Sequence, residues 1–341
     1  MGRRTAFVLI LAVAGVLLLV AANLLLGSAR IPAGDVLCAL VAGPDCADTP
    51  QAFIVWQWRI PLCVTALLSG AALSVSGLLL QTVLSNPLAD PSILGISSGA
   101  GLGAAVVTLC AGFGAGGVFG ATGFAAITVG AFMGALLVTA IVLALSTVVR
   151  SNALLLIAGI MIGYVASSLI SLLSYFSTAE GIRSYVLWGM GTFGGVPLER
   201  LRAFAGVTVM GLMLSALLVK PINALLLGEH YATNLGVNVR RTRAFLLVIT
   251  SLLTAVVTAF CGPISFIGIA VPHIARLLLR TSDHKSLLPA TLLGGSAIAL
   301  LCNLICMVPG RSGLLPLNAV TPIICAPVVV YVILRQRKNA Y

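Results

Sequence analysis

The sequence has 341 residues, of which 60% are hydrophobic and 8% are charged, with a formal net charge of +11. A mean hydropathy of +1.16 excludes an ordinary soluble domain and indicates a helical protein that crosses a membrane several times. A transmembrane β-barrel is excluded because the apolar runs are long and continuous, and nucleic-acid binding is excluded because the basic residues stand in short clusters between these runs.

Ten apolar segments, each about twenty residues long, can cross a bilayer as helices. The first has no small-residue cleavage site and is expected to remain as an anchor span. We therefore predict an all-α polytopic membrane protein with a single transmembrane domain over residues 1–341. Ten spans divide into two halves of five, about 1–180 and 181–341, and an odd number per half gives them inverted orientations, as in many transporters. The segments lie at about 5–27, 59–83, 92–111, 121–148, 152–176, 200–220, 241–261, 264–280, 287–308 and 316–335.

The charged residues orient these spans. If the N-terminus is cytoplasmic, thirteen of the nineteen Lys and Arg residues fall at cytoplasmic ends, which is the excess that the positive-inside rule favours. Both termini are then cytoplasmic, and so is the polar segment Pro221–Val239. All eight acidic residues lie in loops or at span ends. A proton- or sodium-coupled transporter usually keeps an ionisable group near the midplane, so this pattern favours an energy source outside the chain.

Span two and the start of span three carry one continuous block, Trp58–Gly103, which includes WRIP, SGAALSVSGLLLQ and SNPLADPSILG. Asn86-Pro87 and Asp90-Pro91 predict a tight cytoplasmic turn, because a residue before proline is kept out of the helical region. The small residues of span two let helices approach closely. By themselves these features favour packing and a turn.

Span five places Gly159, Gly163, Ser167, Ser171 and Ser174 on one helical face, because they are spaced by four, four, four and three residues. Close packing is the better interpretation of the two glycines. The three serines are open to two interpretations, which are helix packing and a mildly polar wall of a passage.

The segment Pro221–Val239 is too polar to lie in hydrocarbon. It predicts a short helix from Ile222 to about Leu227, a turn at Gly228, and a second short helix, Glu229–Leu235, that ends at Gly236. Two ordered helices at a membrane surface indicate a docking platform, whereas a solvated connector would need only a few residues.

A second block, GPISFIGIAVPHIAR at Gly262–Arg276, forms span eight and is followed by SDHKSLLP. Pro272 predicts a break or kink in this span. His273 has no second ligand at metal spacing, so we interpret it as a packing residue and predict no metal site. The chain contains no phosphate-binding GxxxxGK[ST] motif and no nucleophile–base arrangement, so no catalytic residue is predicted. Cys38 and Cys46 share an outer loop and are equally well interpreted as bonded or as free thiols.

These two blocks, together with LGEHYATNLGVNV at Leu227–Val239, resemble the FecCD/BtuC-type permease subunits of ATP-binding-cassette (ABC) importers for iron–siderophores, haem or cobalamin. The resemblance covers about 31–334. It implies a homodimer in the cell inner membrane, with two copies of a cytoplasmic ABC ATPase and a periplasmic substrate-binding protein. ATP and Mg would be bound by the partner ATPase, and the permease would be no enzyme and would hold no cofactor. The cargo would be a metal chelate, with ferric siderophore first, then haem, then cobalamin; the alternative function is an ion-coupled secondary transporter or a channel.

The resemblance also assigns roles to residues. It implies that Pro221–Val239 is the coupling loop that enters a groove of the ATPase, and that span five lines the central passage between two permease copies. The expected passage residues are Ser167, Ser171 and Ser174. The expected ATPase-coupling residues are Leu227, Gly228, Glu229, Ala232, Leu235 and Gly236.

Docking of the binding protein is expected at Arg59 and Arg311. Arg59 stands in WRIP where the family carries an arginine, but Leu62 replaces the second arginine of that motif. Asn303 and Met307 stand where the family has aspartate and arginine in span nine. Arg311 lies four residues after Met307, which on a continuing helix keeps the same face and moves the charge about 6 Å outward. An ordinary turn residue is an equally good interpretation of Arg311.

Overall fold

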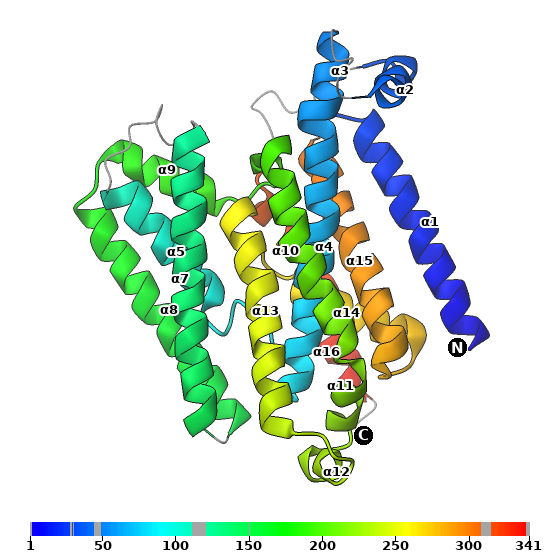
Figure 1. Cartoon of the computed structure of the whole chain (residues 1–341), viewed down its shortest axis with the longest axis vertical. Helices are drawn as coiled ribbons and strands as arrows, with labels where there is room; N and C mark the ends of the chain where they lie inside the picture. Colours follow the sequence, from blue (N-terminus) through cyan, green and yellow to red (C-terminus); the bar gives the residue numbers. More distant parts are fainter. Residues whose placement is uncertain are drawn as a thin grey trace.

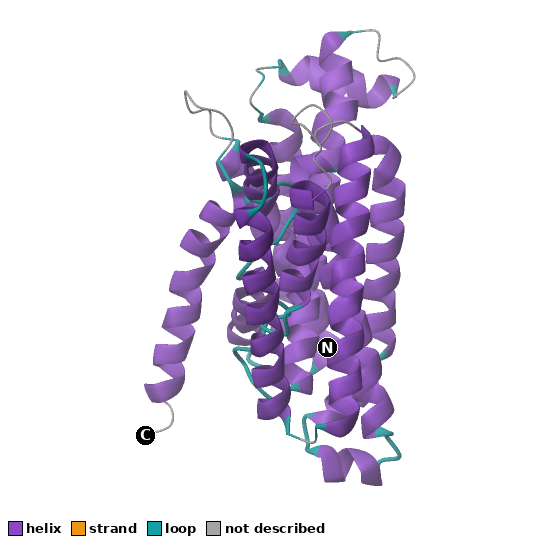
Figure 2. Ribbon diagram, turned by 90° about the vertical axis from the view of Figure 1, so that its left-hand side faces the viewer, coloured by secondary structure: helices purple, strands orange, loops and turns teal. Residues whose placement is uncertain are grey.

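The computed structural model describes residues 2–27, 29, 31–43, 49–110, 121–149, 151–307 and 315–338. Throughout these ranges the regular structure is helical, with no strand (Figure 2). Seven of the described helices are long and apolar enough to cross a membrane. They are α1 (Arg3–Leu25), α4 (Ile60–Val83), α7 (Ala121–Val148), α8 (Asn152–Tyr175), α10 (Leu198–Leu217), α13 (Val239–Cys261) and α15 (His284–Cys306).

Three further helices complete the set of predicted spans. They are α5 (Ile96–Ala105), which a π-helical turn extends to Cys110, α14 (Ile267–Leu279) and α16 (Leu317–Lys338). These ten helices match the ten predicted segments one for one, so the prediction of an all-α protein with about ten spans is confirmed.

The connections hold further short helices (Figure 1). At the N-terminal end of α4, α3 (Pro50–Ile54) and a π-helical turn run directly into the span, and α2 (Ala33–Ala42) packs beside them. After α8 comes α9 (Ala179–Gly189), a helix outside the ten predicted spans. Its signal was Thr178, whose side chain accepts a hydrogen bond from the Gly181 N–H as an N-cap does.

The two halves are related by their packing. α4 packs against α15 as α13 packs against α7, and α5 contacts α7 and α8 as α14 contacts α15 and α16. Exchanging the halves therefore maps these contacts onto one another, which is what two inverted five-helix repeats produce. The first helix of each half departs from this rule, since α1 packs on α15 whereas α10 packs on α13 and α4.

α5 and α14 are short because their N-terminal turns are irregular. α14 has 13 residues, so it is about 20 Å long, less than the thickness of the hydrocarbon core. α5 begins after Gly95, which has a φ of +79°, four residues later than predicted, because residues 91–95 form turns. Asp90 lies in this loop yet is 5% exposed, so the loop folds into the protein instead of lying in water.

The centre of the bundle is built on close helix contacts. Of the most apolar part of the α4 span, 78% is buried, against 17% for α8 and 11% for α1. A methyl group on Gly70 would overlap the carbonyl of Gly295 in α15, and one on Gly77 would overlap the carbonyl of Gly268 in α14. Small residues therefore fix how near α4 lies to two neighbours, as is common between membrane helices.

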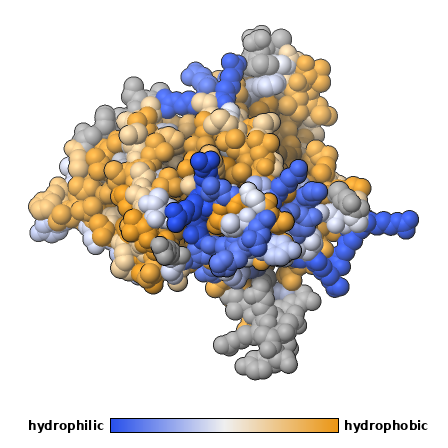
Figure 3. Space-filling model, turned by 60° about the horizontal axis from the view of Figure 1, so that its bottom comes forward, coloured by the Kyte–Doolittle hydropathy of each residue, from blue (hydrophilic) through white to orange (hydrophobic). Residues whose placement is uncertain are grey.

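One end of the molecule is polar. The start of α1, the end of α16 and the short helices α11 (Val219–Leu225) and α12 (Glu229–Asn234) lie toward this end (Figure 1). Hydrophilic side chains gather on it, and the flanks beside it are apolar (Figure 3). The connection between α10 and α13 is thus placed where a polar segment can meet water.

Candidate functional site

The helix–turn–helix predicted for Pro221–Val239 is present as α11 and α12, which we call the platform. Gly228 has a φ of +103° and Gly236 a φ of +81°, which side chains with a Cβ rarely adopt. Gly228 separates α11 from α12, and Gly236 stands just after the end of α12. The first helix starts and ends earlier than predicted, because Val219–Leu225 continues almost directly from α10.

The platform presents a row of apolar side chains. Leu227 is 63% exposed, Tyr231 56% and Leu235 59%. Ala232, one of the expected coupling residues, is fully buried and therefore supports α12 from beneath. An exposed apolar row on an otherwise polar end is the arrangement expected of a surface that another protein covers.

Polar contacts tie α12 to two spans. Arg243 in α13 donates to Glu229 Oε1 at 2.6 Å and to Asn152 Oδ1 at 2.9 Å, and both contacts use its Nη2 atom. Asn152 is the first residue of α8. The sequence motifs predict a coupling role for Glu229 but none for Arg243 and Asn152, because the 91 positions between these two residues hide the contact.

α11 is tied to a different pair of spans. The Asn223 amide nitrogen donates to Asp283 Oδ1 at 2.6 Å, and its oxygen accepts from the His284 backbone N–H at 2.9 Å. The His284 ring lies 3.0 Å from the Thr82 hydroxyl at the end of α4. The N–H of Lys285 and the amide of Asn223 hold the pKa of the Asp283 carboxyl below its usual range, so this carboxylate stays charged at neutral pH.

The small residues of α8 divide between two environments. Gly159 is buried, and a methyl group there would come within 2.7 Å of the Leu94 Cα, so this glycine serves packing. Ser167 and Ser171 are exposed and Ser174 is half-buried. The Ser171 and Ser174 hydroxyls donate to carbonyls one turn back in their own helix, at 3.0 and 2.8 Å. The serines therefore lie on the open side of α8 in one protomer.

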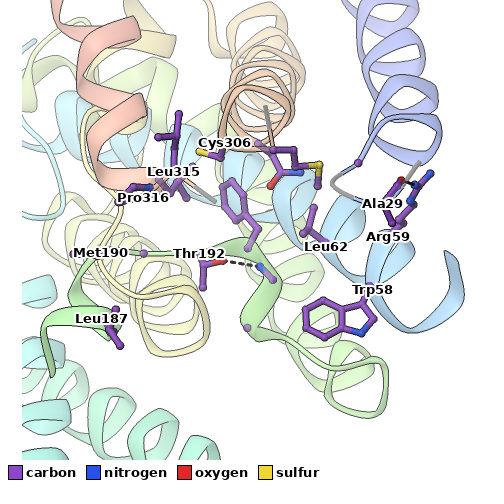
Figure 4. Close-up of a pocket in the computed structure, with 18 of the residues that line it drawn as sticks. Ala29, Trp58, Arg59, Leu62, Leu187, Met190, Thr192, Cys306, Leu315 and Pro316 are labelled. Carbon is purple, nitrogen blue, oxygen red and sulfur yellow. Dashed lines mark hydrogen bonds between the residues drawn. The ribbon is translucent and has the colours of Figure 1, made fainter. Parts of the chain in front are cut away.

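At the end opposite the platform, a cavity of about 600 Å³ opens between α15, the start of α4 and the segment after α9 (Figure 4). Its wall is mostly apolar, and Thr192 and Asn303 add polar groups. The wall includes Trp58, Leu62, Met190, Phe193, Cys306 and Met307.

Arg59 lies at one side of this cavity beside Ala29 (Figure 4). Its side chain is 4% exposed, and its guanidinium donates to the carbonyls of Leu24 at 2.6 Å, Leu25 at 3.0 Å and Ala29 at 2.7 Å. The carbonyls of Leu24 and Leu25 belong to the last turn of α1, where a helix leaves carbonyls without partners, and Ala29 lies in the segment that follows. In this structure the expected docking arginine therefore closes the end of α1. The other one, Arg311, and the possible disulfide partner Cys46 lie outside the described residues.

Asn303, which departs from the family pattern, has a specific partner. Its Nδ2 donates to Asn23 Oδ1 at 2.7 Å, and Asn23 donates to the Leu300 carbonyl at 3.2 Å. Both asparagines are buried, and together they join α1 to α15. The sequence contained a signal for this pair, since a lone asparagine in an apolar span requires a polar partner. Met307, the other departure, lines the cavity of about 600 Å³.

No described residues bring together three His, Cys, Asp or Glu side chains that could hold a metal ion. The His273 ring lies 2.8 Å from the Pro87 carbonyl, so it joins α14 to the loop between α4 and α5. This contact agrees with the interpretation of His273 as a packing residue.

Comparison with known proteins agrees with this arrangement. A model of the FecCD transport family matches residues 15–335. The chain is 37% identical over 306 residues to the vitamin B12 import system permease protein BtuC of Citrobacter koseri, covering 89% of this chain and 90% of that protein. It is 38% identical over 316 residues to BtuC of Klebsiella pneumoniae subsp. pneumoniae, covering 92% and 89%.

A solved structure described as an inward-facing conformation of a metal-chelate type ABC transporter superposes with a TM-score of 0.84. The two sequences are 26% identical, and the match covers 97% of this chain and 99% of that one. With nearly the whole sequence matched by a family model and by relatives above 30% identity, the chain belongs to the FecCD transport family.

Proposed function

We propose that the chain is the permease subunit of an ABC importer that moves a metal chelate from the periplasm into the cytoplasm, with ATP hydrolysed by a separate subunit. Family membership supports the importer class. The observation that carries the proposal is the platform, which presents Leu227, Tyr231 and Leu235 on the polar end of a membrane bundle. A channel or an ion-coupled transporter has no need of such a surface.

The proposed complex contains two copies of the permease, two ATPases and a binding protein. The open side of α8 supports the pairing, because it exposes Tyr164, Val165 and Leu172 beside the serines. In a dimer built on this side, Ser167, Ser171 and Ser174 line a shared passage whose mild polarity neither traps nor excludes a bulky chelate. The platform end, with both chain termini, faces the cytoplasm, in keeping with the positive-inside rule.

The first substrate candidate is a cobalamin-type corrinoid. The BtuC relatives belong to vitamin B12 import systems, and this moves cobalamin ahead of the ferric siderophores and haem that the sequence motifs alone placed first. The apolar outer cavity and the uncharged α8 face are compatible with a large neutral ligand.

The test is uptake into proteoliposomes that contain the permease with the ATPase and the binding protein of the same organism. We expect radiolabelled cyanocobalamin to accumulate only with ATP inside and binding protein outside. A ferric siderophore and haem, tested in parallel, identify the substrate if cobalamin is not taken up. Accumulation that needs no ATPase and collapses with an ionophore would instead establish the ion-coupled alternative.

A further inference from the structure

We propose that Arg243 is the positioning residue that makes α8 follow the platform, while Asn223 fixes the other side of the platform to the core. This inference rests on the proposed function, in which a partner ATPase moves the platform. The contacts of Arg243 would transmit the movement of the platform to α8, and the contacts of Asn223 would hold the platform to the centre of the bundle.

The contacts of Arg243 place it between the moving surface and α8. One nitrogen, Nη2, bonds both Glu229 of α12 and Asn152 of α8. The Arg243 side chain is 17% exposed and that of Glu229 is 58% exposed. Because the two acceptors share one donor atom, Glu229 and Asn152 keep their spacing when the platform shifts, unless one of the bonds breaks.

α8 is suited to follow such a shift. It is a 24-residue helix with 17% of its most apolar part buried, and among the described elements it packs mainly on α5, α7 and the turn after α5. A helix transmits an axial displacement along its whole length, here roughly 36 Å. Movement of Asn152 at its first turn therefore reaches Ser167, Ser171 and Ser174.

The contacts of Asn223 have the opposite character. Asn223 bonds Asp283 and His284 at the start of α15, and the His284 ring lies against Thr82 at the end of α4. α4 and α15 pack closely on each other at the centre of the bundle. This side of the platform is therefore a fixed point, about which α12 turns and draws Arg243 with it.

An isolated exposed ion pair would contribute little to stability or to transmission. The Arg243 contact differs because the side chain is 17% exposed and its guanidinium holds a second, neutral acceptor on another helix. A purely structural role predicts that loss of Arg243 lowers stability or ATPase binding. The positioning role predicts that ATPase binding survives and that the coupling of hydrolysis to movement is lost.

The experiment uses the reconstituted permease–ATPase complex and the variant Arg243→Gln. We expect ATPase affinity within about twofold of the wild type and continued ATP hydrolysis, with uptake reduced by about tenfold or more. In a background without native cysteines, nucleotide-dependent labelling of Ser171→Cys should be lost. Arg241→Gln is the matched control, because it removes the same charge two residues away at an exposed position and should preserve both uptake and labelling.

Two further variants guard against misfolding. Arg243→Lys keeps the charge beside Glu229 but lacks the planar fork, and we expect an intermediate loss of uptake. Asn152→Ala leaves Arg243 and the platform intact, and combined with Arg243→Gln it should cause no additional loss, because both break one link. Wild-type uptake by Arg243→Gln, or a parallel loss of ATPase binding, would overturn the inference. Failure of the wild-type permease to bind the ATPase would instead overturn the proposed function.

Discussion

α4 and α8 have the same length, 24 residues, and both are apolar enough to span a membrane, yet one is the centre of the bundle and the other lies at its edge. α4 touches α13, α14 and α15 through glycines and serines, whereas α8 leaves most of its surface open within a protomer. Hydropathy does not separate them, since their values are 2.0 and 2.3. The surroundings of their small residues separate the two helices. The glycines of α4 meet the backbones of neighbouring helices, whereas α8 carries a row of serines on its open side.

The largest expected effect follows from filling a close contact of α4. Gly77→Ala places a methyl group into the Gly268 carbonyl, and α14 cannot move away without disturbing α15. We expect a loss of about 3 kcal/mol in unfolding free energy, or failure to fold. Thermal unfolding of the purified protein in detergent measures it.

Gly206→Ala on α10 is the control, because a methyl group there meets no atom within 4 Å. Its stability should be unchanged or slightly raised. Equal stability of the two variants would show that α4 and α14 are less closely packed than in the structure. The difference in packing between α4 and α8 would then be smaller than described.

A smaller effect is expected at the outer end of the α4 span. Arg59→Ala leaves the carbonyls of Leu24, Leu25 and Ala29 without their donor, and we expect a loss of about 2 kcal/mol, with Arg59→Lys in between. Unfolding and binding-protein association should be measured on the same samples. If Arg59 docks the binding protein, its replacement slows association in a salt-dependent way and leaves stability unchanged. If Arg59 caps α1, its replacement lowers stability at any salt concentration.

The smallest effect is expected on the open side of α8. Ser171→Ala should change stability by less than about 0.5 kcal/mol, because the side chain is exposed and its hydroxyl bonds only to its own helix. Cysteines at Ser167, Ser171 and Ser174 should react with a membrane-impermeant thiol reagent in a nucleotide-dependent way. A cysteine at Ser74, which is buried in α4 against the Thr291 carbonyl, should remain protected in every state. Protection of all three α8 positions as well would favour packing over a passage.

Features that depend on local sequence were predicted well. Ten apolar runs became ten helices, and the turn at Gly228 follows from a glycine that alone suits the backbone there. The position of the Arg59 side chain could not be predicted from the local sequence, because its inward turn depends on where α1 ends. Likewise, Asp90 lies in a loop by sequence, but only the packing of that loop against α14 buries it.

The pairing of Asn23 with Asn303 has a consequence for biogenesis. The two residues are 280 positions apart, and at 5–20 residues per second the ribosome needs tens of seconds to supply the second after the first. Until then the Asn23 amide can rely on the Leu19 carbonyl of its own helix, 2.8 Å away. α1 can therefore be inserted early as a self-satisfied helix that Arg59 ties to the start of α4, but it gains its most extensive packing partner late, when α15 arrives.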